Sequence, residues 1–150
     1  MGDLRDLYQE MILDHGKRPR NFRKPEEVSA CAEGHNPLCG DRFTVYLDIK
    51  EGVVKDVSFQ GGGCAISTAS ASMMTESLKG KNLTEVQELF QKFHELLTKE
   101  SNSQVEAPDL GKLSVFSGVR EFPMRVKCAT LAWHTLRAAL EDGMKSVSTE

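Results

Sequence analysis

Three cysteines and one aspartate are the residues of this sequence whose types and positions suggest metal binding or thiol chemistry. Cys39 and Asp41 stand in the segment NPLCGD, Cys64 follows a glycine run in GGGCAIS, and Cys128 lies in VKCATLA. Thiolates and a carboxylate are ligands that zinc accepts in tetrahedral sites. No two cysteines form a C-x-x-C pair, so unrelated buried or surface thiols remain the alternative to a metal site at this point.

The predicted elements place these four residues where they can converge. If the extended conformation begins by Cys39, then Cys39 and Asp41 share one face of a strand with Phe43, because alternate residues of a strand point the same way. Cys64 stands before a predicted helix, whose N-terminus stabilises a thiolate. Cys128 falls in the second turn of the last predicted helix. All of them therefore belong to the ends of packed elements.

Apolar periodicity and turn residues predict an α+β fold. Strands are predicted over residues 41–50 and 53–59, joined by a turn at Glu51-Gly52, with a weaker strand within residues 28–37. The first predicted helix covers residues 3–15, and Gly16 is its stop signal. Another helix is predicted to begin with a Thr84–Gln87 capping box. Further helices are predicted over residues 65–79, 109–116 and 123–142. We therefore expect a single domain over residues 1–150, in which a small antiparallel three-stranded sheet packs against about five helices.

Composition narrows the possible functions. The 150 residues include 19 basic and 22 acidic side chains, a net charge of -3, which argues against dedicated nucleic-acid binding. No segment approaches the roughly 20 apolar residues of a membrane span, and the polar N-terminal residues contain no apolar signal core. We therefore expect a cytoplasmic protein, in which the cysteines act as thiolates rather than in disulfides.

Residues 17–25 form a basic segment, with five positive charges and two prolines. Prolines at this density predict an exposed irregular loop. A solvated connector and a docking surface for an acidic partner both remain open as interpretations of this loop.

The three cysteine segments, in this order along the chain, resemble those of the IscU/NifU-like iron–sulfur cluster assembly family. The resemblance spans nearly the whole sequence and implies the fold of that family. It also implies that Cys39, Asp41, Cys64 and Cys128 line one exposed site.

Two further features are similar to the SufU branch of that family. Lys127 stands where scaffold members carry a histidine. The segment before Lys127 is longer than in those scaffolds, and we expect it to form a helical insertion around residues 81–120. The resemblance implies a zinc-dependent sulfurtransferase that accepts persulfide sulfur from a SufS-type cysteine desulfurase and passes it to downstream iron–sulfur assembly machinery. Cys39 is then the acceptor, and Arg125 matches an arginine implied to help a partner histidine replace Cys39 on the metal. A scaffold that carries a transient iron–sulfur cluster is the alternative.

The remaining cysteine and the histidines have simpler interpretations. Cys31 is expected to be a free thiol, while His35, near Cys39, is a candidate occasional fourth ligand. His15, His94 and His134 are expected to be surface or packing residues.

Overall fold

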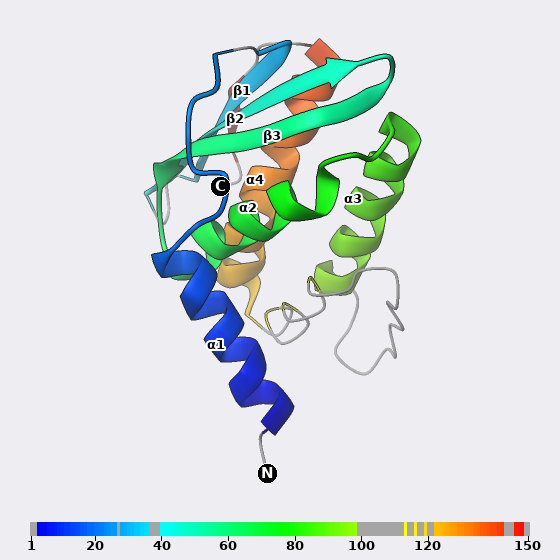
Figure 1. Ribbon diagram of the computed structural model, residues 1–150. Helices are drawn as coiled ribbons and strands as arrows, with labels where there is room; N and C mark the ends of the chain where they lie inside the picture. The colour runs from blue at the N-terminus through cyan, green and yellow to red at the C-terminus, as the bar shows by residue number, and fades with distance from the viewer. Residues whose placement is uncertain are drawn as a thin grey trace.

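The computed structural model describes residues 3–26, 28–36, 40–98, 113, 116, 119, 122–142 and 146–148. They form an α+β fold in which a twisted sheet lies over a layer of helices (Figure 1). In chain order the elements are α1 (Asp3–Lys17), β1 (Ala30–Asn36), β2 (Asp41–Lys50), β3 (Val53–Gly62), α2 (Ala65–Leu78), α3 (Leu83–Thr98), α4 (Pro123–Asp142) and β4 (Ser146–Ser148).

The sheet has the strand order β3-β2-β1-β4. Strand β2 pairs antiparallel with both β1 and β3, which confirms the predicted antiparallel sheet. The turn between β2 and β3 has positive φ at Glu51 (54°) and Gly52 (75°), the backbone that suits a tight two-residue hairpin. The prediction of three strands omitted β4, a short strand that pairs parallel with β1.

Helices α2 and α4 cover one face of the sheet, with α2 against β3 and α4 against β1 and β2. Phe43, Val45 and Leu47 alternate along β2 and are fully buried against these helices. A Cβ at Gly34 of β1 would collide with the hydroxyl of Thr135, so the absence of a side chain there lets α4 approach the sheet closely.

Helix α3 packs on α4 through aromatic side chains. The ring of Phe93 stacks on Trp133 with centroids 4.6 Å apart, and Phe116 meets Phe93 edge-on at 5.7 Å. Trp133 also donates a hydrogen bond from Nε1 to Ser70 Oγ of α2 at 3.1 Å. These contacts join α2, α3 and α4 in one core.

Helix α1 lies against α2 on the side away from the sheet (Figure 1). The prediction that Gly16 ends this helix was wrong, because α1 continues to Lys17. Gly16 instead faces the start of α2, where a Cβ would lie only 3.2 Å from the carbonyl oxygen of Ala65. A close helix contact, rather than a helix stop, explains the glycine.

The start of α3 also differs in detail from its prediction. The capping box is formed by Asn82 and Glu85: each backbone N–H donates to the other's side chain, at 3.1 and 2.9 Å. It stands two residues before the predicted Thr84–Gln87 pair.

The described residues contain four α-helices, fewer than the five or so expected. Most of the predicted helix at 109–116 lies outside the described residues; Leu113 and Phe116 of that segment are buried, in 3₁₀ turns. Within the described part of the chain, we find no helix with the length and apolarity to cross a membrane.

Candidate metal centre

Three potential metal ligands lie together at one edge of the molecule. A carboxylate oxygen of Asp41 and the sulfur atoms of Cys64 and Cys128 all lie within 4.8 Å of one another. Asp41 is the first residue of β2, Cys64 directly precedes α2, and Cys128 is in the second turn of α4. The fold thus brings together three residues that are far apart in sequence.

Asp41 is fully buried and points to the same side of β2 as Phe43. Its Oδ1 accepts a hydrogen bond of 2.9 Å from the backbone N–H of Cys64, and its Oδ2 lies 4.0 Å from the sulfur of that residue. A buried carboxylate is costly unless it is hydrogen-bonded or neutralised. One oxygen is therefore fixed by the backbone, while the other faces the thiol.

Cys64 is the N-cap residue of α2, with an extended backbone (φ -69°, ψ 167°). Its sulfur accepts a hydrogen bond from the backbone N–H of Ser67 at 3.4 Å, and the Ser67 hydroxyl lies 3.5 Å away. The start of α2 thus directs a backbone N–H at the sulfur of Cys64, and the thiolate is the form of cysteine that binds metals.

Gly63 leaves the space that the Asp41 carboxylate occupies. A Cβ at this position would lie 2.7 Å from Asp41 Cγ and 2.7 Å from Ser67 Oγ, which is closer than real Cβ atoms come. A Cβ at the neighbouring Gly62 would meet nothing within 4 Å. The last glycine of the GGGC segment is therefore required by the packing of the ligand cluster.

Two thiols and a carboxylate arranged in this way fit zinc by donor type and spacing.

The first turns of α4 supply the remaining side of the cluster. Cys128 is fully buried, while Arg125, one turn earlier, is exposed. Residues three apart on a helix lie on neighbouring parts of its surface, so the exposed Arg125 is a neighbour of Cys128 on α4. Lys127 is half-buried beside Cys128.

Cys39 lies outside the described residues, together with Pro37 and Leu38. Both flanking positions are fixed: Gly40, at φ +76°, donates its N–H to the carbonyl of Asn36 at 2.8 Å. This hydrogen bond joins the two residues on either side of the segment that contains Cys39, and Asp41 of the cluster follows directly.

The other sequence candidates lie apart from this cluster. Cys31 is a half-buried free thiol of β1, and His35 stands near the end of the same strand, opposite Arg42 of β2. His15 is a packing residue: it is 4% exposed, and its Nδ1 lies 2.7 Å from the hydroxyl of Ser72 in α2. His94 and His134 face each other between α3 and α4.

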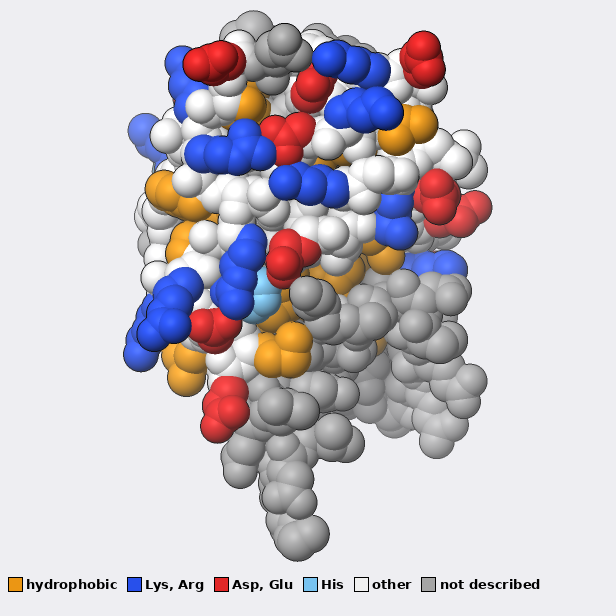
Figure 2. Space-filling model, in the orientation of Figure 1, with side chains coloured by type: hydrophobic (Ala, Val, Ile, Leu, Met, Phe, Trp, Pro, Cys, Tyr) orange, Lys and Arg blue, Asp and Glu red, His pale blue; other side chains and the backbone are white. Residues whose placement is uncertain are grey.

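Two arginines of the basic 17–25 segment have structural partners, which the sequence did not reveal. Arg20 donates to Asp14 at 2.7 Å and Arg23 donates to Asp56 at 2.6 Å. The hydrogen bond from Arg20 lowers the pKa of the Asp14 carboxyl; burial alone would raise the pKa of Asp56, but hydrogen bonds from Arg23 and Lys79 lower it. Basic and acidic side chains are accordingly interspersed over this face (Figure 2).

Part of the basic segment is also bound along the sheet. Phe22 bridges to Phe59 of β3, with its ring edge-on at 5.2 Å, and Arg23 N–H donates to the carbonyl of Phe59 at 3.0 Å. Arg18 and Lys24 are exposed.

Curated relatives match almost the whole chain. It is 39% identical to the Bacillus subtilis protein named zinc-dependent sulfurtransferase SufU over 144 residues, which cover 94% of this chain and 95% of that one. It is 37% identical to the protein of Streptococcus pyogenes serotype M1 named iron–sulfur cluster assembly scaffold protein IscU over 141 residues, 94% of this chain and 87% of that one.

A solved structure shares the fold. The SufU protein of Fervidobacterium islandicum AW-1, described as a candidate iron–sulfur cluster assembly scaffold for the SUF system, superposes with a TM-score of 0.81 at 36% identity. The superposition covers 88% of this chain and 95% of that one. The family model described as NifU-like N terminal domain matches residues 7–129, a range that includes Cys39, Cys64 and Cys128. The chain therefore belongs to the NifU-like N-terminal domain family.

Proposed function

We propose that this protein accepts persulfide sulfur from a SufS-type cysteine desulfurase at Cys39 and passes it into iron–sulfur cluster assembly. In this proposal Cys39, Asp41, Cys64 and Cys128 hold zinc, and the protein works in the cytoplasm. The observation that carries the proposal is the cluster of Asp41, Cys64 and Cys128, whose ligand atoms lie within 4.8 Å of one another.

Zinc bound at this cluster would keep the ligating thiols deprotonated near neutral pH. The protein's own residues prepare the place for it. The backbone N–H of Cys64 orients the Asp41 carboxylate, and the backbone N–H of Ser67 at the start of α2 donates to the sulfur of Cys64.

Sulfur transfer is a thiol–disulfide type exchange. The Cys39 thiolate attacks the terminal sulfur of the desulfurase persulfide. A sulfur–sulfur bond forms at Cys39, the sulfur–sulfur bond of the donor breaks, and the donor cysteine leaves as a thiolate. Electrons and atoms balance without an oxidant. In this proposal Arg125, which is exposed one turn before Cys128, helps a histidine of the partner to replace Cys39 on the metal.

Assembly of an iron–sulfur cluster on this protein is the second candidate, because several relatives are named as scaffolds. Lys127 favours sulfur transfer instead. A protonated lysine has no lone pair for a metal, so the half-buried residue beside Cys128 cannot serve as an additional ligand in that state.

Incubation with a SufS-type cysteine desulfurase and free cysteine, followed by intact-mass analysis, tests the proposal. We expect the wild type to gain the mass of one sulfur atom, and Cys39→Ser to gain none. Cys31→Ser is the matched control, since it removes a thiol of β1 that lies outside the cluster, and should gain sulfur normally. Sulfur addition to Cys39→Ser at the wild-type rate contradicts the assignment of the acceptor. Purified protein that contains iron and sulfide rather than zinc favours the scaffold function.

A further inference from the structure

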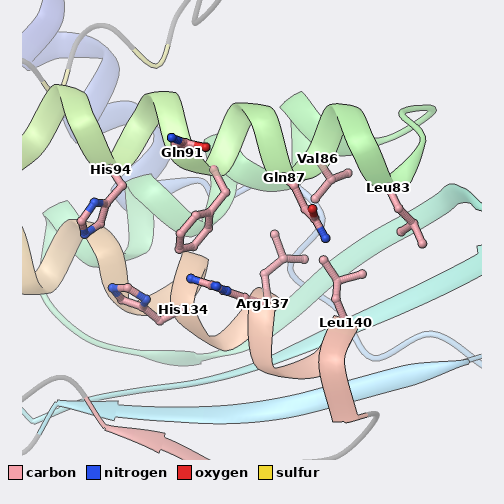
Figure 3. Close-up of a pocket in the computed structure, with 10 residues that line it drawn as sticks. Leu83, Val86, Gln87, Gln91, His94, His134, Arg137 and Leu140 are labelled. Atoms are coloured by element: carbon pink, nitrogen blue, oxygen red, sulfur yellow. The ribbon is translucent and has the colours of Figure 1, made fainter.

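A groove of about 410 Å³ runs between α3 and α4, apart from the metal-ligand cluster (Figure 3). Its floor is apolar. Val86 and Leu136 are almost fully buried beneath it, and Leu83, Phe90 and Leu140 complete its apolar walls. This volume lies in the range of about 300–1,000 Å³ that is typical of small-molecule sites with a mostly apolar lining.

One side of the groove carries basic groups. His94 of α3 and His134 of α4 face each other with ring centroids 5.9 Å apart, and Arg137 of α4 lies next to them (Figure 3). The guanidinium of Arg137 rests over the ring of Phe90, 5.5 Å from its centroid. None of the described residues that line the groove carries a carboxylate. The amides of Gln87 and Gln91 add neutral hydrogen-bonding groups.

Positive charge on His94 and Arg137 disfavours a positive charge on His134. Burial lowers the pKa of His134, and His94 on the facing helix and Arg137 on its own helix lower it further. An anion between them would offset that repulsion, so its binding should raise the pKa of His134. By linkage, a ligand that raises the pKa of a histidine binds more tightly as the pH falls toward that pKa.

We infer that this groove binds a small anion in which a carboxylate or phosphate group is attached to an apolar body. The anionic group sits among Arg137, His134 and His94, and the apolar body lies over Val86 and Leu140. Arginine and histidine are suited to anionic oxygens because each donates charged or polarised hydrogen bonds. This site is independent of the proposed sulfur transfer.

Binding of three aromatic probes to the purified full-length protein tests the inference, with NMR signals of the His94 and His134 rings as the readout. Benzoate and phenyl phosphate carry the two candidate head groups, and benzyl alcohol is the uncharged control. We expect both anions to shift these signals saturably, and we expect benzyl alcohol to bind much more weakly. The anion that binds with the higher affinity identifies the preferred head group. Benzoate should bind more tightly at pH 6 than at pH 8.

Two substitutions assign the binding to the groove. Arg137→Gln removes a charged donor and should weaken benzoate binding about tenfold or more. Gln87→Glu keeps Arg137 but adds a carboxylate on the opposite helix, and it should also weaken binding. Lys55→Gln is the control, because it removes one exposed positive charge that does not line the groove. Thermal unfolding of each variant verifies that the fold is intact.

The inference is overturned if the anions cause no saturable shift, or if benzyl alcohol binds as tightly as benzoate. It is equally overturned if Arg137→Gln and Gln87→Glu, while folded, bind benzoate like the wild type. Neither zinc content nor sulfur acceptance enters these measurements, so failure of the proposed function leaves their outcome unchanged.

Discussion

Single atoms decide the geometry of the ligand cluster. The backbone N–H of Cys64 holds one oxygen of Asp41, and this bond requires the chain at Gly63 to pass directly against the carboxylate. A glycine run allows a close approach of this kind, because glycine has no side chain. The sequence could not predict which group is approached, because Asp41 is more than 20 residues away in sequence.

Gly63→Ala should therefore damage the cluster. The new Cβ would collide with the carboxylate of Asp41 and the hydroxyl of Ser67, and overpacking of this kind typically costs about 1–3 kcal/mol. We expect a lower melting temperature and less zinc per chain, measured by calorimetry and elemental analysis. Gly62→Ala adds the same methyl group where nothing lies within 4 Å and should retain zinc. Full zinc content in Gly63→Ala would show that the carboxylate can move without loss of the site.

Among the elements, α1 depends on a few polar contacts with α2. The hydroxyl of Ser72 accepts a hydrogen bond from the backbone N–H of Arg20 at 2.8 Å and lies 2.7 Å from Nδ1 of His15. It thereby links both the end of α1 and the segment that follows to α2.

Ser72→Ala should weaken this attachment. It removes a shared partner from two buried or half-buried polar groups, a loss that usually costs about 1–3 kcal/mol. Ser77→Ala is the control on the same helix, since within the described residues the Ser77 hydroxyl donates only to the carbonyl of Met73, one turn earlier. Denaturant unfolding of both variants measures their free energies of unfolding, which can then be compared with each other. Equal stabilities would show that the hydroxyl of Ser72 is not needed to hold α1.

Elements with strong local signals were predictable from the sequence. The hairpin of β2 and β3 follows from alternation and a Glu51-Gly52 turn, and α4 begins at Pro123 as expected. Signals that depend on distant residues were not predictable. Strand β4 is too short to show a period, and Gly16 belongs to a helix contact with Ala65. The capping box was misplaced because two overlapping residue pairs fit its pattern.

At the scale of the whole molecule, the ligand cluster lies where the beginning of β2 meets α2 and α4. If zinc binds there, it links three segments that the unfolded chain keeps far apart, so its binding free energy adds to folding.

Removal of zinc with a chelator should therefore lower the melting temperature. A loss of about 3 kcal/mol corresponds to a decrease of roughly 6–12 °C for a chain of this size. Calorimetry with and without chelator measures the effect. In Cys64→Ser, which lacks one thiolate, the chelator should cause little further decrease. An unchanged melting temperature of the zinc-free wild type would mean that the metal does not stabilise the fold.

Charge on the molecular surface is the second property at this scale. Because Arg20 and Arg23 pair with Asp14 and Asp56, reversing them would disturb the fold as well as any docking. Arg18 and Lys24 are the exposed cations that test docking separately.

Arg18→Glu combined with Lys24→Glu should slow association with the desulfurase several-fold at low salt, because steering by exposed charges is strong only where screening is weak. The difference from wild type should shrink as ionic strength rises. Lys55→Glu combined with Lys81→Glu makes the same change in net charge elsewhere. Stopped-flow association rates compare the two pairs. Equal rates for both would identify the basic segment as a connector.

Trp133 is the one tryptophan in the sequence, and its surroundings give it a practical use. Its indole stacks on α3, donates a hydrogen bond to α2 and belongs to the helix that carries Cys128. An indole that leaves such a dry, hydrogen-bonded place for water emits at longer wavelength. The chain thus contains a single indole that reports, without any added label, whether α4 is packed against α2 and α3 as the protein folds or unfolds.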